Sequence, residues 1–365
     1  MYLPLYLTCL LVAQPASELH FRKIDEGKIE VIAPLTAGQQ KAMSSGKFSA
    51  EQGEAWLRLC LLDAETGKPG PAMLGTYQRD DADLIFRPRF GVEPGRTYRA
   101  SFGPVDGPTV TRDYRSALRN GGAQTTVLKI YPTADVVPAN HLKFYIYFSQ
   151  PMRGGQDIFS QIEILDADGN ALTDVWLADE LWDEAGQVLI IYIHPGRIKW
   201  GVVLRDVLGP VLLPGKDYTF VVRGTMVDAN GQKLGKDVMK RFRTTAEDRV
   251  RVDLSDWKVQ APKTGTVGPL IVQFPKSLDH KSLERFLSVS DAHGKPVAGK
   301  LVIGKEEKTW SFVPARPWEN QDYRLLVNGR LEDVAGNTPL RPFDLDLQAP
   351  AQPAQRLELS FRPPP

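Results

Sequence analysis

The sequence predicts an all-β protein of three tandem β-sandwich domains, the middle one enlarged by a loop insertion. Three observations predict this class: an internal repeat of turn and strand motifs, turn signals about every 8 to 12 residues, and almost no 3.6-residue hydrophobic periodicity. The 31 glycines and 28 prolines among 365 residues also suit a chain with many tight turns. Only residues 282–287 have a short helical pattern.

The N-terminal segment has the character of a secretory signal. Residues 2–13 form an uncharged apolar run that is too short to cross a bilayer, since a spanning helix needs about 20 residues. The small residues Ala13 and Ala16 lie near its end, so we expect a signal peptide over 1–16 and an exported protein, in the periplasm, at the cell surface or secreted. No lysine or arginine precedes the run, and a buried N-terminal strand is the alternative.

The two cysteines have separate interpretations. Cys9 lies in the apolar run, but Thr8 precedes it where a lipoprotein signal normally has a small residue, so lipid anchoring through Cys9 is not expected. Cys60 would be the single cysteine left after cleavage, and its apolar surroundings predict a buried strand position. No other run reaches 18 apolar residues, so no transmembrane segment is expected in the mature chain.

The internal repeat joins an aspartate turn to a later strand that begins with tyrosine. In each copy a turn aspartate precedes an alternating strand, and a second turn then leads to a tyrosine that can bury its ring and bond its hydroxyl to a nearby loop. The intervals from aspartate to tyrosine are 35, 52 and 32 residues. The pairs are Asp63 with Tyr98, Asp166 with Tyr218, and Asp291 with Tyr323. The middle copy therefore contains an insertion, which we place near 194–210.

The repeat and the composition of the connecting segments predict the domain order. After the signal peptide we expect a divergent β domain over 17–110, a middle domain over 126–246 and a third domain over 250–347. The segment 348–365 is a proline-rich tail, which we expect to be extended. Apolar residues alternate near its end, so it could also add a late edge strand.

The second and third copies contain further motifs that carry a family resemblance. Phe-Ser-Gln-Pro-Met stands at residues 148–152 and Pro-Gly-x-x-Tyr at 214–218 of the second copy, and a Phe-x-Pro strand stands at 312–314 of the third. An Asp-x-Ala-Gly-Asn turn closes the third copy at residues 333–337. This pattern resembles bacterial Ig-like domains of the S-layer-protein type, over 126–346 well and over 17–105 loosely. The resemblance implies Ig-like β-sandwiches in an exported spacer, wall-associated or adhesion protein, and it brings no catalytic residues.

Composition and motifs exclude several chemical functions. With 45 Lys and Arg against 44 Asp and Glu, the net charge is +1, so we expect no nucleic-acid partner. The five histidines form no ligand pairs, so no metal site and no cofactor are expected. Residues 166–170 imitate the start of a calcium loop, but Leu177 stands where a bidentate glutamate is required. Weak structural calcium at turn carboxylates remains the one metal option.

The insertion carries the most unusual local sequence, His-Pro-Gly-Arg-Ile-Lys-Trp-Gly at 194–201. Loops on a rigid β scaffold often bind partners, so we regard four of its residues, together with one tryptophan before it, as candidate binding residues. They are His194, Arg197, Lys199, Trp200 and Trp182. The two cations alternate and could face one side to meet a carboxylate or phosphate, while the indole of Trp200 offers a stacking plane. The alternative is structural: Ile198 and Trp200 pack the insertion onto the sandwich and the cations extend to solvent.

These observations favour a non-enzymatic exported protein that performs structural or recognition work at the bacterial cell envelope or in the periplasm. The expected partner is a protein or glycan surface. A carbohydrate-active hydrolase, or its glycan-binding accessory, is the alternative function, because acidic and tryptophan residues gather over 179–200. Two carboxylates facing each other across a cleft would favour hydrolysis, whereas an exposed aromatic patch would favour binding.

Overall fold

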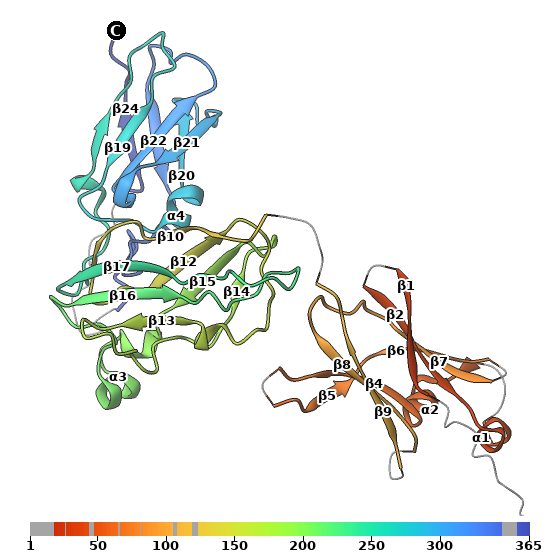
Figure 1. Ribbon diagram of the computed structural model, residues 1–365. Coiled ribbons are helices and arrows are strands. Elements are labelled where there is room, and N and C mark those ends of the chain that lie inside the picture. The colour runs from red at the N-terminus through yellow and green to blue at the C-terminus, as the bar shows by residue number, and fades with distance from the viewer. Residues whose placement is uncertain are drawn as a thin grey trace, which may run out of the picture. The chain divides into compact units, whose positions relative to one another are not determined.

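The computed structural model shows an all-β chain with a few short helices (Figure 1). It describes residues 18–25, 27–43, 47–64, 66–80, 82–104, 108–118, 123–344 and 356–365. The expected signal peptide and Cys9 lie outside this set. The chain forms two compact units, one of residues 1–123 with 229–232 and one of 124–228 with 233–365.

The first unit contains a β-sandwich, the first domain, whose core lies between two sheets. Val31, Leu57, Leu59 and Phe86 are fully buried there. One sheet has the order β1(His20–Asp25), β2(Lys28–Pro34), β7(Asp83–Pro88), β6(Gly75–Arg79) and β3(Lys47–Phe48), and the other β5(Pro69–Ala72), β4(Leu57–Leu62), β8(Thr97–Phe102) and β9(Val110–Arg115). Cys60 lies in β4 with a free thiol whose pKa is raised by burial.

Two short helices in the first domain were not predicted from the sequence. They are α1(Ala37–Ala42) and α2(Ala50–Glu54). Each begins in a capping box, in which a hydroxyl residue and a glutamine three positions later bond each other's backbone N–H groups. The helices are too short to produce a recognisable hydrophobic period, which explains why the pattern analysis missed them.

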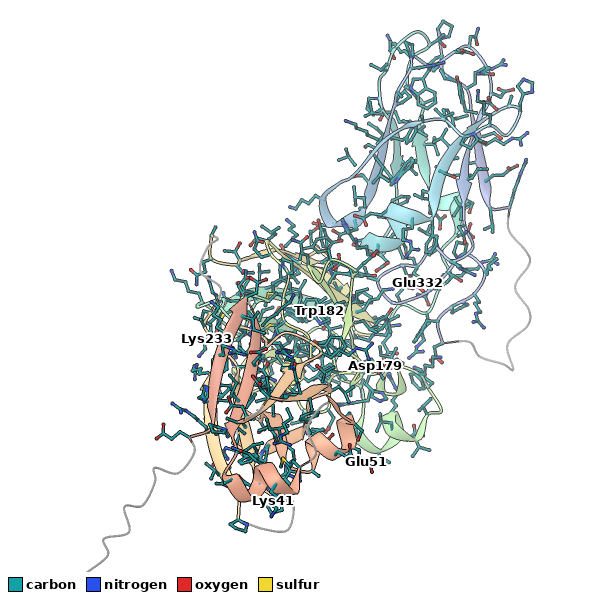
Figure 2. All side chains as sticks on the ribbon, turned by 90° about the vertical axis from the view of Figure 1, so that its right-hand side faces the viewer. Lys41, Glu51, Asp179, Trp182, Lys233 and Glu332 are labelled. Carbon is teal, nitrogen blue, oxygen red and sulfur yellow. The ribbon has the colours of Figure 1, made fainter. Side chains whose placement is uncertain are left out.

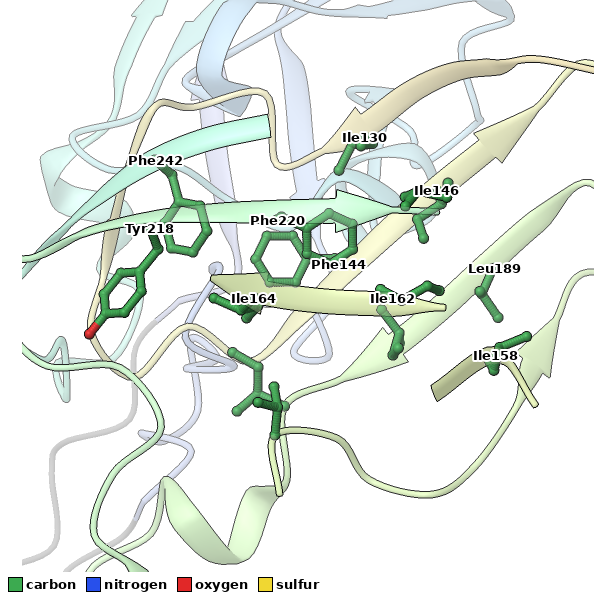
Figure 3. Close-up of a cluster of buried hydrophobic side chains, with 14 of the residues drawn as sticks. Ile130, Phe144, Ile146, Ile158, Ile162, Ile164, Leu189, Tyr218, Phe220 and Phe242 are labelled. Carbon is green, nitrogen blue, oxygen red and sulfur yellow. The ribbon is translucent and has the colours of Figure 1, made fainter. Parts of the chain in front are cut away.

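The middle domain begins the second unit and packs two four-stranded sheets face to face. Figure 3 shows its core, where the rings of Phe144 and Phe220 lie 4.4 Å apart between the sheets. One sheet has the order β10(Val127–Tyr131), β12(Lys143–Phe148), β15(Val188–Tyr192) and β14(Leu181–Trp182), and the other β11(Val136–Pro138), β17(Val238–Thr245), β16(Asp217–Val222) and β13(Ile162–Leu165). The first strand therefore changes sheets: β10 pairs with β12, and β11 continues in parallel with β17.

The third domain follows the short turn η3(Leu254–Asp256) and is also a sandwich. Its sheets have the orders β18(Lys258–Gln260), β19(Leu270–Gln273), β22(Thr309–Pro314), β21(Gly299–Ile303), and β20(Leu287–Asp291), β23(Tyr323–Val327), β24(Glu358–Phe361). Helix α4(His280–Arg285) overlaps the helical pattern at 282–287, but it begins two residues earlier and Leu287 already belongs to β20. β24 comes from the end of the expected tail and pairs with β23, which places Phe361 in the core against Tyr323.

The repeated aspartate and tyrosine residues perform the same local work in successive domains. Asp166 and Asp291 each accept backbone N–H groups two and four residues later, which closes the hairpin turn. The hydroxyls of Tyr98, Tyr218 and Tyr323 each accept a backbone N–H four or five residues upstream, at 2.8, 2.9 and 3.1 Å. These bonds confirm the predicted role of the tyrosines and tie each strand to the loop before it.

Candidate functional site

The insertion leaves the middle sandwich after β15 and returns before β16. It contains the 3-10 turn η2(Pro195–Arg197) and helix α3(Val203–Leu208). Pro195 occupies the first position of the turn, and Nδ1 of His194 accepts the N–H of Gly196 at 3.0 Å, which fixes the turn at its start. Buried Ile198 and Leu212 belong to the core of the middle domain, so both ends of the segment are anchored.

Arg197 is a structural cation inside the insertion. It is 8% exposed, and its guanidinium donates to the carbonyl oxygens of Thr173, Asp174, Leu208, Gly209 and Pro210 at 2.7 to 3.3 Å. Burial lowers the pKa of Arg197. Because the backbone turns here instead of extending, Arg197 and Lys199 do not alternate on one strand face; Nζ of Lys199 lies 4.6 Å from the ring of Phe343.

Trp200 presents its indole to solvent from a framework of ion pairs. It is 65% exposed, and its Nε1–H donates to Glu247 at 3.2 Å. The guanidinium carbons of Arg205 and Arg249 lie 5.1 and 5.2 Å from the ring centre. Burial opposes ionisation of Glu247, but hydrogen bonds from Arg205, Arg249 and Trp200 hold the pKa of this carboxyl below its usual value. Since Arg249 also pairs with Asp344, the indole is held in place by charged neighbours.

Helix α3 adds exposed aliphatic side chains next in sequence to this indole. Val203 and Val207 are 75% and 73% exposed, and their spacing of four residues places them on one side of the helix. Leu208 is 44% exposed at the end of the same helix. We call Trp200, Val203, Val207 and Leu208 the insertion surface. Exposed apolar side chains that adjoin one another are candidates for an association site.

Trp182 stands apart from the other four candidate residues. It pairs with Leu189 near the start of β15, whereas His194 follows the end of that strand, about 16 Å farther along at 3.3 Å per residue. Its ring packs 5.8 Å from Phe148, and its Nε1–H donates to Glu180 at 2.6 Å. Figure 2 labels Trp182 and Asp179 on the middle domain. The structure thus brings together residues 194–200 and separates Trp182 from them.

The carboxylates near Trp182 take part in local structure. Glu180 accepts the N–H of Gly155 at 3.0 Å in addition to the indole of Trp182. Asp183 accepts the N–H groups of Gln187 and Val188 at 2.7 and 2.9 Å, which closes the turn into β15. These hydrogen bonds give both acids a role in the fold of the hairpin.

Sequence reasoning missed a buried polar junction between the middle and third domains. Lys143 on β12 is 7% exposed, and its Nζ lies 2.6 Å from Glu332 and 3.7 Å from Asp279. Tyr145 on the same strand donates its hydroxyl to Asp279 at 2.9 Å, and Asp279 also accepts Ser282 N–H at the start of α4. Burial opposes the charge of Lys143, but the two carboxylates raise its pKa above the usual value.

A second part of the junction surrounds the ammonium of Lys276. Its Nζ lies 2.8 Å from Asp248, 2.6 Å from Asp333 and 2.9 Å from the carbonyl oxygen of Val250. Asp333 starts the closing Asp-x-Ala-Gly-Asn turn and also accepts from the side chain of Asn337 at 2.9 Å. Burial raises the pKa of Asp333 to about 6, although Lys276 and Asn337 favour its ionised form. The turn motif was the sequence signal that could have pointed here.

The described part of the chain lacks both a cluster of metal-ligating side chains and a membrane-spanning helix. Within residues 18–344 and 356–365, apart from the short gaps given above, no three or more His, Cys, Asp or Glu side chains gather in a metal-binding arrangement. In the same part of the chain, no helix has the length and hydropathy of a membrane span.

Comparisons with protein-family models and with curated proteins gave no match. Among solved structures, the N-terminal part of the bacterial S-layer protein SbsC is 15% identical with a TM-score of 0.26, over 57% of this chain and 41% of that chain. The FN1–FN3 domains of chicken CNTN1 are 10% identical with a TM-score of 0.22, over 96% and 99%. A tetra-tandem repeat of a large adhesion protein is 14% identical with a TM-score of 0.25, over 88% and 70%.

The chain thus spans less than half the length of the S-layer fragment that it matches. The strands and sheets described above, rather than these likenesses, establish the all-β sandwich class.

Proposed function

We propose that the protein is an exported, non-enzymatic recognition and structural protein of the bacterial cell envelope, and that its insertion surface binds a protein partner. The observation that carries the proposal is the exposure of Trp200, Val203 and Val207 on a segment anchored by buried Arg197. A tryptophan beside arginines on a rigid support is typical of the residues that dominate binding energy at protein interfaces.

The chemistry of the insertion surface favours a protein over a glycan. Sugar-binding surfaces combine flat aromatic rings with polar groups that satisfy hydroxyls, whereas Val203, Val207 and Leu208 offer only aliphatic contact. The hydrolase alternative receives less support, because Glu180 and Asp183 are already engaged in the hairpin they stabilise.

The domain junction supports the structural half of the proposal. Lys143 and Tyr145 of the middle domain meet Asp279 of the third domain in a buried network, which favours one relative orientation of these two domains. A spacer or adhesion module benefits from such rigidity. We assign β24, from the end of the expected tail, to the third of the three expected domains, because Phe361 completes the core of that domain.

We also propose that this junction uses a lysine in the place of a metal ion. The ammonium of Lys276 is surrounded by Asp248, Asp333 and a backbone carbonyl, which are oxygen ligands of the kind calcium prefers. Chelation with EDTA should therefore leave the melting temperature unchanged, and a fall of several degrees would contradict the assignment.

Photo-crosslinking in the native host tests the binding proposal. Benzoylphenylalanine placed at Val203 or Val207 should yield the same discrete protein adduct, and Trp200→Ala should abolish it. Val302, 59% exposed on β21 of the third domain, is the matched control position. Equal adducts at Val302, adducts that survive Trp200→Ala, or adducts that consist of glycan would overturn the proposal. Mass spectrometry of the N-terminus from the same cells tests export by showing whether residues 1–16 are removed.

A further inference from the structure

A groove with a volume of about 1000 Å³ runs along the middle domain between β10 and β17, away from the insertion surface. Figure 1 shows these two strands in the same domain, one from each sheet. The groove exists because the first strand changes sheets: β10 pairs with β12, while β11 covers the edge of β17 only from Arg243 to Thr245. Among the described strands, none pairs with this edge of the rest of β17, residues 238–242.

The open edge presents backbone groups ready for another strand. Arg243 donates its backbone N–H to the carbonyl oxygen of Asp135 at 2.8 Å, on the side where β11 lies. In an antiparallel pair every second residue points its N–H and C=O the same way, so those of Met239 and Arg241 point to this edge too. Neither N–H has a hydrogen-bond partner among the described residues. An extended peptide could therefore continue the sheet, as happens in β-augmentation.

The side chains along the groove specify what such a peptide would carry. On the inner side its residues would extend the apolar core of the middle domain, to which Ile130 and Phe242 belong and against which Val238 packs. Lys240 and Arg243 already pair with Asp135 and Asp217.

The groove contains two further cations. In the described part of the chain, Lys129 and Arg241 are exposed and have no carboxylate partner. A bound strand would gain from acidic residues opposite these two cations.

We infer that this groove binds an extended segment of a partner protein in which acidic and apolar residues alternate, added as a strand to the edge of β17. A second copy of the same β17 is a poor occupant, because antiparallel pairing centred on Lys240 would set two lysines directly opposite each other. The charge of the groove thus favours an acidic strand from another protein.

Fluorescence anisotropy with a short, capped and labelled peptide of alternating valine and glutamate tests the inference on the full chain. Met239→Pro removes one edge N–H without touching the bonds to β16, and proline is tolerated at a sheet edge. It should weaken binding about tenfold or more, whereas Met239→Ala, which keeps the N–H, should bind like the wild type. Circular dichroism confirms that both variants keep the fold.

A charge swap provides the second arm. Arg241→Glu should reverse the preference, so that a peptide with lysine in place of glutamate binds the variant better than the wild type. The inference is overturned if the acidic peptide does not bind the wild type, if Met239→Pro binds it as well as Met239→Ala, or if Arg241→Glu leaves the preference unchanged. Absence of binding to the wild type would mean that the cations only protect an edge against association. Equal binding by the two Met239 variants would mean that the peptide does not add to the edge of β17.

Discussion

Replacement of Lys276 by methionine should destabilise the second unit strongly, because it leaves a buried carboxylate without its cation. The side chain of Asp333 is only 1% exposed, and Nζ of Lys276 lies 2.6 Å away. Breaking a buried ion pair by removal of one partner costs about 3–5 kcal/mol. Lys276 itself is 26% exposed, so we expect the lower end, about 3 kcal/mol, which corresponds to roughly 6–12 °C in melting temperature for a unit of this size.

The control for this experiment is Lys308→Met. Lys308 pairs with Glu306 at a similar distance, 2.8 Å, but both side chains are well exposed, at 45% and 35%. Exposed pairs contribute little to stability, so this variant should melt like the wild type. Differential scanning calorimetry of both variants separates the effect of burial from that of losing a lysine.

The pH dependence of the loss gives the reasoning a second check. The folded-state pKa of Asp333, about 6, lies above its usual value of 3.8, so the folded protein binds this proton first and stability falls as pH rises through that window. Without Lys276 the pKa should rise further. Acidification from pH 7.5 to 5 should therefore restore much of the stability lost in Lys276→Met. An equal loss at both pH values, or melting like Lys308→Met, would refute the proposed role of the buried pair.

Three further predictions concern single residues. Arg197→Met should lower the free energy of unfolding by about 3 kcal/mol in urea titration, because it strands several buried carbonyl groups, whereas Trp200→Ala should change it little. Burial lowers the pKa of His141 to about 3, so the unfolded chain binds this proton first and the folded protein loses stability as pH falls below about 6.5. His141→Phe should therefore reduce the change of unfolding free energy with pH by up to about 1.4 kcal/mol per pH unit in matched denaturant titrations. Phe361→Ala should lower the free energy of unfolding by about 3 kcal/mol, measured by calorimetry, because β24 completes the core of the third domain. An unchanged free energy of unfolding would mean that β24 does not contribute to this core.

The parts of the fold that were predicted correctly depend on neighbours in the sequence. An aspartate that closes a turn bonds N–H groups two and four residues away, and Tyr218 reaches an N–H five residues upstream. Because these interactions are local, residue type and spacing were enough to predict the turns, the alternating strands and the site of the insertion.

The candidate site was harder to interpret, since its residues act through partners that are distant in the chain. Arg197 looked like a surface cation beside Lys199, yet it is buried among carbonyl groups of residues 173–174 and 208–210. Trp200 donates hydrogen bonds to Glu247 and Asp344 and lies beside the guanidinium of Arg249. These contacts with distant residues hold its indole at the surface. A pattern of neighbouring residues does not predict contacts between residues that are distant in the sequence.

Residue order alone was sufficient for the all-β class, the repeated units and the enlarged middle domain, because turn chemistry and strand alternation act over a few residues. Only the packed chain settled which charges are buried together, such as Lys143 with Asp279 and Lys276 with Asp333, and which strand edge stays open beside β10. These features arise where segments more than 50 residues apart in the sequence come into contact. Burial at such contacts strengthens the interactions between charged residues, which a sequence pattern does not reveal.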